Sequence, residues 1–473
     1  MHRLLLFVLL ASWAAPGPAG AEAIAVDAAV VARHLAEAIR FPTVSHQDPE
    51  RFDAQPFENL LDHFRATYPL VHERLTVERI AGYSLLLTWQ GSDPELAPAL
   101  FMSHTDVVPV EQEALKGWTH PPFGGVIEGD FIWGRGSLDV KSGVVGWLEA
   151  AEGLLAQGFE PARSLIFAFG HDEEIGGEQG AAALAATLRE RGVKLSFLVD
   201  EGGFLSTDLG LVPGKIVAQI NTAEKTYFTI HLTARSDGGH SSTPPAHTAV
   251  GKLATAIHRL EANPFPLRIS QPVRDLFAAL APHLPLGRRL AVNNLWLTGR
   301  IVARRMAEDP LQAAMLRTTT AATMISGGVK ENVVPKRATA TVNFRILPGE
   351  TPDDVLAHVR AVIDNPEIEI ESDTWSQAPR PGRVDAFGYQ VLTDAVHDVY
   401  PEAIVVPGLL LGATDTRHYA DIADDAYRFL GGMVTRAQIP SIHGTDERIG
   451  IESLANAVRV QARVLQRAGE AEL

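Results

Sequence analysis

Apolar positions along the chain follow two spacings that alternate with each other. Short apolar runs, as expected for buried strands, are found at 85–89, 99–103, 164–169 and 195–199. Apolar residues three or four positions apart, as in amphipathic helices, are found at 24–40, 139–155 and 179–191. Because the predicted strands and helices alternate along the chain, the pattern predicts an α/β fold with a mainly parallel sheet covered on both faces.

This alternation is interrupted after Lys215. The interruption contains strands of period two, as in antiparallel sheets, and apolar segments with helical spacing. The predicted strands are 216–221, 227–235 and 338–347, and the predicted helical segments are 246–261 and most of 271–325. We therefore expect a separate unit inserted into the α/β body.

The α/β pattern resumes after the interruption. Thr351 and Pro352 predict a capped helix start, and 451–466 forms a final amphipathic helix. The boundaries expected from these changes are 22–215 and 347–473 for the two parts of the body and 216–346 for the inserted domain.

Composition excludes several classes of protein and limits the chemistry of those that remain. Apolar residues form 46% of the 473 residues, too many for a disordered or collagen-like chain. The net charge of −16 argues against nucleic acid as a partner. Cysteine is absent, which excludes disulfides, thiolate metal sites and a cysteine nucleophile. Any metal must therefore be held by His and carboxylate side chains.

The first 21 residues have the pattern of a secretory signal peptide. Arg3 provides a positive charge, 4–15 are almost wholly apolar, and Ala19-Gly20-Ala21 fits an A-x-A cleavage site. The apolar run of 12 residues is short for a membrane span, although an uncleaved anchor is the alternative. We therefore expect cleavage after Ala21 and a secreted or periplasmic protein with no membrane span in its mature part.

Residues suited to chemistry follow the ends of the predicted strands. His104 and Asp106 come after strand 99–103, and alternate residues of an extended segment point the same way. Asp106 can therefore accept a hydrogen bond from the imidazole of His104 and fix its tautomer, as occurs at metal sites. Read alone, the two residues are as easily an ordinary surface pair.

Five other candidate residues are also ambiguous when taken singly. Asp139 lies in a glycine-rich loop that fits neither a P-loop nor a dinucleotide-binding loop, and it is equally suited to capping a helix. Glu173 and Glu174 follow strand 164–169 in an acidic segment. Crowding ionised carboxylates is costly unless a positive charge is near, which favours a metal site. A solvated acidic loop is the alternative. Asp200 ends a third strand, and His443 is a lone histidine in a loop before the final helix.

Together these residues indicate a metal centre more strongly than any does alone. The candidate ligands are His104, Asp139, Glu174, Asp200 and His443. Such a set of imidazole and carboxylate groups, with one carboxylate available as a bridge, suits two zinc ions roughly 3.5–4 Å apart. We therefore expect two zinc ions in each chain.

Nine segments, in order along the chain, resemble motifs of a known enzyme family. They are SHTDVVPV at 103–110, WGRGSLDVKSG at 133–143, GHDEEIGGEQGA at 170–181, LVDEGG at 198–203, DGGHSS at 237–242, ENVVP at 331–335, NFRILPG at 343–349, GATDTRHY at 412–419 and IHGTDER at 442–448. The sequence is similar to the co-catalytic-zinc amidohydrolases and exopeptidases, which include acetylornithine deacetylase, aminoacylase and glutamate carboxypeptidase. The branch that it most resembles contains carboxypeptidase S and the secreted N-fatty-acyl-amino acid synthase/hydrolase.

The resemblance implies a role for each candidate. One zinc ion would be held by His104, Asp139 and Asp200, and the other by Asp139, Glu174 and His443, with Asp139 as the bridge. Glu173 would be the general base, and Asp106 would orient His104. The peptide between Asp139 and Val140 would be cis.

The resemblance also implies that the insertion is a small α/β sandwich, a lid that forms a homodimer. His240 would stabilise the oxyanion, commonly in the active site of the neighbouring subunit. Asn332 and Arg345 would hold the substrate carboxylate or the oxyanion. Arg345 is the better candidate for a carboxylate, because a guanidinium binds it through two parallel hydrogen bonds; the alternative is an exposed charge on a strand.

The expected function is therefore zinc-dependent hydrolysis of an N-acyl amino acid or short peptide that releases a free amino acid. A zinc aminopeptidase is one alternative, but it would need a site for a free substrate N-terminus. A periplasmic metal- or ligand-binding relative without catalysis is another, but it would not need Glu173.

The apolar segment 271–325 has two interpretations. Its apolar residues have helical spacing, so they can form the core of the lid itself. Alternatively, some of them line a channel for an apolar acyl group, which the resemblance favours. The second interpretation predicts that longer acyl chains are better substrates.

Overall fold

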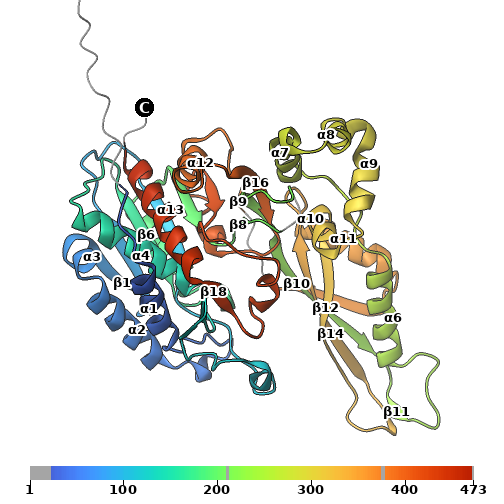
Figure 1. Ribbon diagram of the computed structural model, residues 1–473. Helices are drawn as coiled ribbons and strands as arrows, with labels where there is room; N and C mark the ends of the chain where they lie inside the picture. The colour runs from blue at the N-terminus through green and yellow to red at the C-terminus, as the bar shows by residue number, and fades with distance from the viewer. Residues whose placement is uncertain (1–22, 209–211, 374–378, 471–473) are drawn as a thin grey trace, which may run out of the picture.

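The computed structural model describes residues 23–208, 212–373 and 379–470, and the predicted signal peptide lies outside them. Figure 1 shows a large layered body beside a narrower unit that projects from it. We call the narrower unit the lid and define it below by its strands. Within the described residues, no helix is both long and apolar enough to cross a membrane.

The body is built on a nine-stranded sheet in the order β1-β2-β6-β3-β7-β17-β9-β16, with β8 beside β9. Its strands are β1 (Thr76–Ile80), β2 (Ser84–Trp89), β3 (Ala99–His104), β6 (Leu165–Gly170), β7 (Phe197–Asp200), β8 (Leu205–Ser206), β9 (Val217–Glu224), β16 (Ile404–Leu410) and β17 (Ala426–Arg428). The central strands β6, β3, β7 and β17 are parallel, whereas β1, β2 and the junction of β17 with β9 are antiparallel. The predicted α/β class with a sheet parallel at its centre is confirmed.

Helices cover both faces of this sheet, as the alternating pattern predicts. The body helices are α1 (Ala28–Ile39), α2 (Ala54–Thr67), α3 (Pro69–Arg74), α4 (Lys141–Ala156), α5 (Ala181–Glu190), α12 (Phe387–Val399) and α13 (Ile451–Gly469). The larger core lies on the face covered by α1, α4, α12 and α13, where Trp147 of α4 packs against Phe101 of β3 with ring centroids 4.8 Å apart. The other face is covered by α5, whose Leu184 and Leu188 are buried. Each such buried side chain contributes roughly 1.5–3 kcal/mol, which fixes the strand ends that carry the site.

The lid is a four-stranded antiparallel sheet with two helices on one face. Its strands are, in order across the sheet, β12 (Thr319–Gly327), β14 (Arg337–Ile346), β10 (Thr226–Arg235) and β15 (Ile368–Ser372), and its covering helices are α6 (Ala249–Ala262) and α11 (Pro352–Ile363). Thr351 caps α11 through a capping box with Asp354, at the helix start that the sequence predicts. At the far end, β11 (Gly239–His240) pairs with β13 (Val333–Val334).

The grouping of strands differs from the predicted insertion, 216–346, at both ends. Strand β9 pairs in parallel with β16 and so belongs to the body. Helix α11 and strand β15, both after 346, pack in the core of the lid. A strand's hydrophobic pattern reports which faces are buried, and both sheets offer a buried face, so the pattern does not identify the sheet. We propose 226–372 as the lid.

The apolar segment 271–325 is mostly helical, as its spacing predicts. It contains α7 (Gln271–Leu280), α8 (Leu286–Asn293), α9 (Leu295–Met306) and α10 (Pro310–Leu316). Its last residues, however, belong to the edge strand β12, which covers Thr319–Gly327. Leu276 and Leu280 of α7 pack against β9 and β16 at the edge of the body. Helices α8 and α9 form a hairpin at one corner of the molecule (Figure 1).

A third, small sheet borders the site. It consists of β4 (Val126–Glu128), β5 (Phe131–Trp133) and β18 (Arg448–Gly450), all antiparallel. Strand β18 leads directly into α13. This sheet therefore holds the loop before α13 against the loop before α4.

Candidate active site

Acidic and imidazole side chains gather at the carboxyl ends of the central strands. His104 ends β3, Glu173 and Glu174 lie in a short turn after β6, and Glu201 follows β7. Two further members come from loops, Asp139 before α4 and His443 before β18. Open α/β sheets bind their ligands at this edge.

Asp139 lies between two imidazoles. Its Oδ1 is 3.3 Å from His104 Nε2, and its Oδ2 is 2.9 Å from His443 Nε2. Glu201 Oε1 is also 3.3 Å from His104 Nε2, and Glu174 Oε2 is 3.1 Å from His443 Nε2. The two oxygens of Asp139 therefore face different ligand groups, as a bridging carboxylate requires.

Asp106 holds the other side of this arrangement. It is fully buried, and its Oδ1 is 3.2 Å from His104 Nδ1. It also accepts hydrogen bonds from Ser45 Oγ (2.6 Å) and from the backbone N–H groups of Glu173 (3.1 Å) and Glu174 (3.2 Å). One carboxylate thus orients His104, as the residue spacing predicts, and also fixes the turn that carries both glutamates.

Glu447 positions the loop of Asp139, a role that the sequence did not suggest. Its Oε1 accepts hydrogen bonds from the backbone N–H groups of Gly136 (3.0 Å), Leu138 (2.8 Å) and Asp139 (3.1 Å). Its Oε2 accepts one from Arg135. The Asp139–Val140 peptide in this loop is cis, as the resemblance implies. Glu447 follows His443 by four residues, so a single segment supplies a candidate ligand and organises the bridging loop.

Asp200 lies beside the cluster and borders a small cavity with His104 and Glu173, but both of its carboxylate oxygens already accept hydrogen bonds. Its Oδ2 accepts hydrogen bonds from Thr416 N–H (3.1 Å) and Thr416 Oγ1 (2.7 Å), and its Oδ1 from the N–H of Glu201 (2.9 Å). Successive side chains of an extended strand point to opposite sides, so Asp200 and Glu201 face apart. At this strand end it is Glu201 that contacts His104 Nε2, at 3.3 Å. The sequence showed that an acidic pair, Asp200 and Glu201, lies at the end of this strand. It did not show which of the two side chains faces the cluster.

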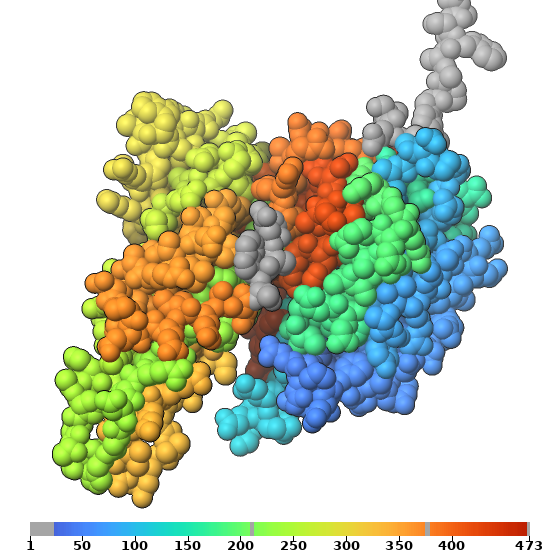
Figure 2. All heavy atoms as spheres, turned by 180° about the vertical axis from the view of Figure 1, so that it is seen from behind, coloured from blue at the N-terminus to red at the C-terminus, as the bar shows by residue number. Residues whose placement is uncertain are grey.

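His240 and Asn332 lie together, but away from the cluster. Both border a hollow of about 560 Å³ at the β11–β13 end of the lid, where Ser241 N–H donates to the carbonyl of Asn332 (3.2 Å). Figure 1 shows β11 at the far tip of the lid, and Figure 2 shows a gap between this tip and the body. Within one chain, therefore, these two predicted residues do not complete the site.

Arg345, by contrast, is at the site. It is on β14, lines the same cavities as Glu173 and Glu174, and lies 4.7 Å from the ring centre of Tyr227. Sequence reasoning missed a second cation here, Arg417, which lines the polar cavity of about 490 Å³ beside Arg345. Both arginines face a region that contains the carboxylates, so the site has a positively charged margin.

The electrostatics of the cluster favour a bound cation. Burial, with the neighbouring Asp415 and Glu201, raises the pKa of the Glu173 carboxyl well above its usual range. Burial and the nearby Asp139 carboxylate raise the pKa of Glu201 to about 7. Carboxylates crowded in this way repel one another, and a positive ion between them removes that cost.

Unsatisfied atoms give a second, independent test of this fit. His104 Nε2 and Glu174 Oε1 are buried and have no hydrogen-bond partner among the described residues. Two groups of donor atoms, His104–Glu173–Glu201 and His104–Asp139–Glu174, each lie within 4.8 Å of one another. Buried polar atoms are normally paired, so atoms left free and aimed at one point are typical of ligands. The residues present therefore fit a metal ion held by nitrogen and oxygen.

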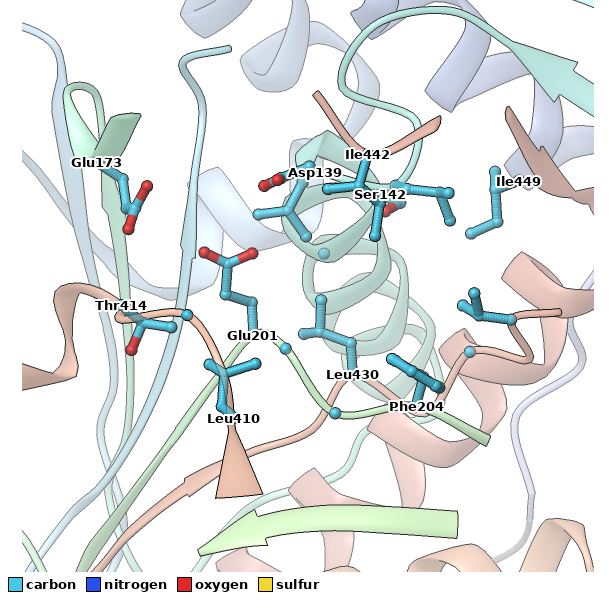
Figure 3. Close-up of a pocket in the computed structure, with 18 of the residues that line it drawn as sticks. Asp139, Ser142, Glu173, Glu201, Phe204, Leu410, Thr414, Leu430, Ile442 and Ile449 are labelled. Atoms are coloured by element: carbon cyan, nitrogen blue, oxygen red, sulfur yellow. The ribbon is translucent and has the colours of Figure 1, made fainter. Parts of the chain in front are cut away.

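An apolar cavity of about 350 Å³ opens directly from the cluster. Its apolar part is lined by Phe204, Leu430, Val434, Ile449, Leu454 and Ala457. Figure 3 shows the carboxylates of Asp139, Glu173 and Glu201 toward one end and Phe204 and Ile449 toward the other. No described residue of 271–325 lines this cavity. The body supplies the apolar wall instead.

The fold and this cluster define a metal-dependent hydrolase with an inserted lid. Residues 100–467 match Peptidase family M20/M25/M40, and the chain belongs to this family. Mouse N-fatty-acyl-amino acid synthase/hydrolase PM20D1 is 38% identical over 442 residues, covering 92% of this chain and 87% of the mouse protein. Carboxypeptidase S of Saccharomyces cerevisiae is 31% identical over 482 residues, covering 90% and 81%.

Solved structures agree at the level of the fold. The M20 family metallo-carboxypeptidase Sso-CP2 of Sulfolobus solfataricus superposes with a TM-score of 0.68 at 20% identity, covering 93% of this chain and 99% of that one. Human carnosine dipeptidase 1 gives the same TM-score at 14% identity, covering 93% and 96%. The predicted family, fold class and enzyme class, a metallohydrolase, are confirmed.

Proposed function

We propose that this enzyme hydrolyses N-acyl amino acids whose acyl group is long and apolar, and releases the free amino acid. The observation that carries the proposal is the apolar cavity of about 350 Å³ that opens from the carboxylate cluster. A peptide hydrolase would need several polar partners for the next peptide group in this position, whereas beyond the cluster these walls are mostly aliphatic and aromatic, with Ser142, Thr414 and Gln461 as the uncharged polar side chains among them. The similarity to an N-fatty-acyl-amino acid synthase/hydrolase supports the same substrate class.

The arrangement suggests how such a substrate would lie. The acyl chain would fill the apolar cavity, where each buried methylene contributes about 0.8 kcal/mol. The amide would lie at the cluster, and the amino-acid carboxylate would meet the guanidinium of Arg345 in the polar cavity. The apolar walls of one cavity and the two arginines of the other thus distinguish the two ends of the substrate.

We propose that two zinc ions are held by His104, Asp139, Glu174, Glu201 and His443, with Asp139 shared. When bound, zinc acidifies a water molecule and polarises the amide carbonyl. Glu173, which is not assigned as a ligand, would take the proton from that water and pass it to the nitrogen of the leaving amine. The support for this division is that Glu174 Oε2 lies 3.1 Å from His443 Nε2, whereas the backbone hydrogen bonds to Asp106 hold both glutamates beside the cluster.

We also propose that the lid forms a homodimer in which His240 of each chain stabilises the oxyanion in the other. The support is that His240 lies at the tip of the lid, apart from the cluster of its own chain. Strand β12 is an edge strand with exposed Met324 and Ile325, and an unpaired edge is a ready surface for pairing with another chain.

Residues 1–21 are proposed to direct export and to be cleaved. The support is their charged, apolar and small-residue order. Mass spectrometry of the N-terminus of protein recovered from the exported fraction tests this, because retention of Met1 there contradicts cleavage.

The substrate proposal is tested by measuring amino-acid release from three sets of compounds, with and without a chelator. The sets are N-acyl phenylalanines of increasing chain length, the same compounds with an amidated carboxyl group, and Gly-X dipeptides. We expect chelator-sensitive release that rises with chain length and falls on amidation, because amidation removes the partner of Arg345. Preference for free N-termini would indicate an aminopeptidase, and metal binding without release would indicate a non-catalytic relative.

A further inference from the structure

The hairpin of α8 and α9 exposes large apolar side chains that the fold does not use. The exposed fractions are 84% for Trp296, 72% for Leu286, 71% for Ile301, 67% for Leu297 and 55% for Leu290. Leu286 and Leu290, and likewise Leu297 and Ile301, are four residues apart, so each pair shares one face of its helix. Isolated exposed apolar residues are ordinary, but five within one helical hairpin mark a binding surface.

The opposite face of the hairpin already provides its attachment to the protein. Leu295, Val302, Ala303 and Met306 of α9 pack with Phe277 of α7 in a small core. The outward apolar residues are therefore not displaced members of the core. They are available on a surface that the remainder of the chain holds in place.

The charge of the same hairpin is opposite to that of the protein. Between Asp275 and Glu308 the sequence has five arginines and no acidic residue, in a chain whose net charge is −16. The arginines are Arg288, Arg289, Arg300, Arg304 and Arg305, all exposed. Only Arg305 has a recorded ion pair, with Glu308, among the described residues. The hairpin is thus a positively charged surface on which four of the five arginines have no ion pair with any described residue.

We propose that α8 and α9 dock the enzyme on an anionic phospholipid surface. Outward Trp, Leu and Ile beside several arginines form the pattern of helices that lie in a membrane interface. The apolar side chains would enter the acyl boundary, and the arginines would meet lipid phosphates. With 12 residues, α9 is about 18 Å long, well short of a bilayer core of about 30 Å, so the hairpin lies on the membrane and does not cross it.

A second copy of this chain is a poorer occupant of the surface. A symmetric dimer through the hairpin would bring two sets of five arginines together without acidic partners, and like charges disfavour such contacts. An anionic lipid surface complements both properties of the hairpin, whereas a neutral apolar partner complements only one.

The chain just after the hairpin is hydrogen-bonded to Lys225, the residue before β10. Lys225 Nζ donates to the carbonyl groups of Ala314 (3.0 Å) and Arg317 (2.9 Å), at the end of α10 that follows the hairpin. Lys225 directly precedes β10, which pairs with the strand of Arg345. Docking would therefore hold the active site at a fixed orientation to the lipid, which is also where compounds with apolar acyl chains concentrate. The docking itself does not depend on the proposed substrate.

Flotation with lipid vesicles, without substrate, tests the proposal. Vesicles of phosphatidylcholine alone are compared with vesicles that contain phosphatidylglycerol. One variant, Trp296→Gln/Leu297→Gln/Ile301→Gln, removes apolar contacts, and another, Arg300→Gln/Arg304→Gln, removes charge. The matched controls are Leu115→Gln/Val250→Gln/Val384→Gln and Arg33→Gln/Arg51→Gln, which change exposed residues elsewhere. All proteins are prepared with the same N-terminus.

We expect binding to the anionic vesicles that is lost in about 0.5 M salt. The charge variant should bind about 25-fold more weakly, at about fivefold per arginine, and the apolar variant at least about tenfold more weakly. Both controls should bind as the wild type does. The proposal is wrong if the wild type binds neither vesicle, binds both equally, or binds no better than the two variants. Self-association that the apolar variant abolishes, without vesicle binding, would assign the surface to a second copy instead.

Because the variants lie away from the cluster, hydrolysis of a short, soluble N-acyl amino acid should be unchanged in all of them. Loss of vesicle binding with this activity intact would concern the docking surface alone. Absence of the activity from the wild type would concern the proposed function alone.

Discussion

The apolar cavity predicts how activity depends on acyl chain length. Each added methylene that enters the cavity contributes about 0.8 kcal/mol, so kcat/KM should rise about fourfold per methylene until the cavity is full. The cavity of about 350 Å³ is lined in part by residues of α13, among them Ala457, whose side chain is buried. Ala457→Leu adds three carbon atoms to this wall.

The substitution should therefore displace about three methylenes of a chain that fills the cavity. The expected loss is about 2.4 kcal/mol, or about 60-fold in kcat/KM, for long acyl chains. An acetyl group does not reach this wall, so N-acetyl substrates should be unaffected. Leucine is a good helix former, so α13 should tolerate it, and extra volume that enters a cavity avoids most of the cost of overpacking.

The assay is kcat/KM for N-acyl phenylalanines from acetyl to long chains, in both proteins, with thermal unfolding as a check on folding. The informative result is a change in the chain length at which the rise ends. An equal loss for acetyl and long-chain substrates, with an unchanged thermal midpoint, would refute the placement of the acyl chain in this cavity. So would an unchanged profile in the variant.

Three further predictions concern the chemistry of the site. Glu173→Gln should keep its metal, measured by elemental analysis, but lose at least about 100-fold in kcat, since the proton carrier is gone; near-normal turnover would remove Glu173 from the reaction. Glu201→Gln should lower zinc affinity at least about tenfold in competition with a chelator, whereas Asp200→Asn should retain zinc. The reverse order would restore Asp200 as the ligand. Mixing His240→Ala and Glu173→Gln chains should recover part of the activity if His240 acts across a dimer; a strictly monomeric and fully active wild type would contradict this.

Most of the fold could be predicted because burial on one or both faces leaves a direct mark on the sequence. The central strands, such as β3 and β6, are buried throughout and appear as continuous apolar runs, and the capping residues of α11 mark its start. The assignment of β9, α11 and β15 to the correct unit could not be predicted. It depends on which strands pair at long range, and the hydrophobic period is the same in either sheet.

The site shows the same division between local and distant information. The strand ends that carry His104 and Glu173 could be located, because a polar cluster that follows an apolar run is a local signal. The choice of Glu201 over Asp200 depends on which side of the strand faces the cluster. The part of Glu447 depends on backbone groups more than 300 residues earlier in the chain, such as Gly136. Neither the orientation of Glu201 nor the role of Glu447 can be predicted from the residues that adjoin it in the sequence.

The position of β17 between β7 and β9 has a consequence for how the protein is made. As the chain emerges from the ribosome, β7 and β9 are complete about 200 residues before the strand that separates them. Until then, Glu224 of β9 lacks the buried partner, Arg428, from which it finally accepts a hydrogen bond of 3.1 Å. The nascent body thus has open strand edges, which invite aggregation and call for chaperones during synthesis. His443 and Glu447 are synthesised later still, so the proposed metal centre is completed only after β17 has been made.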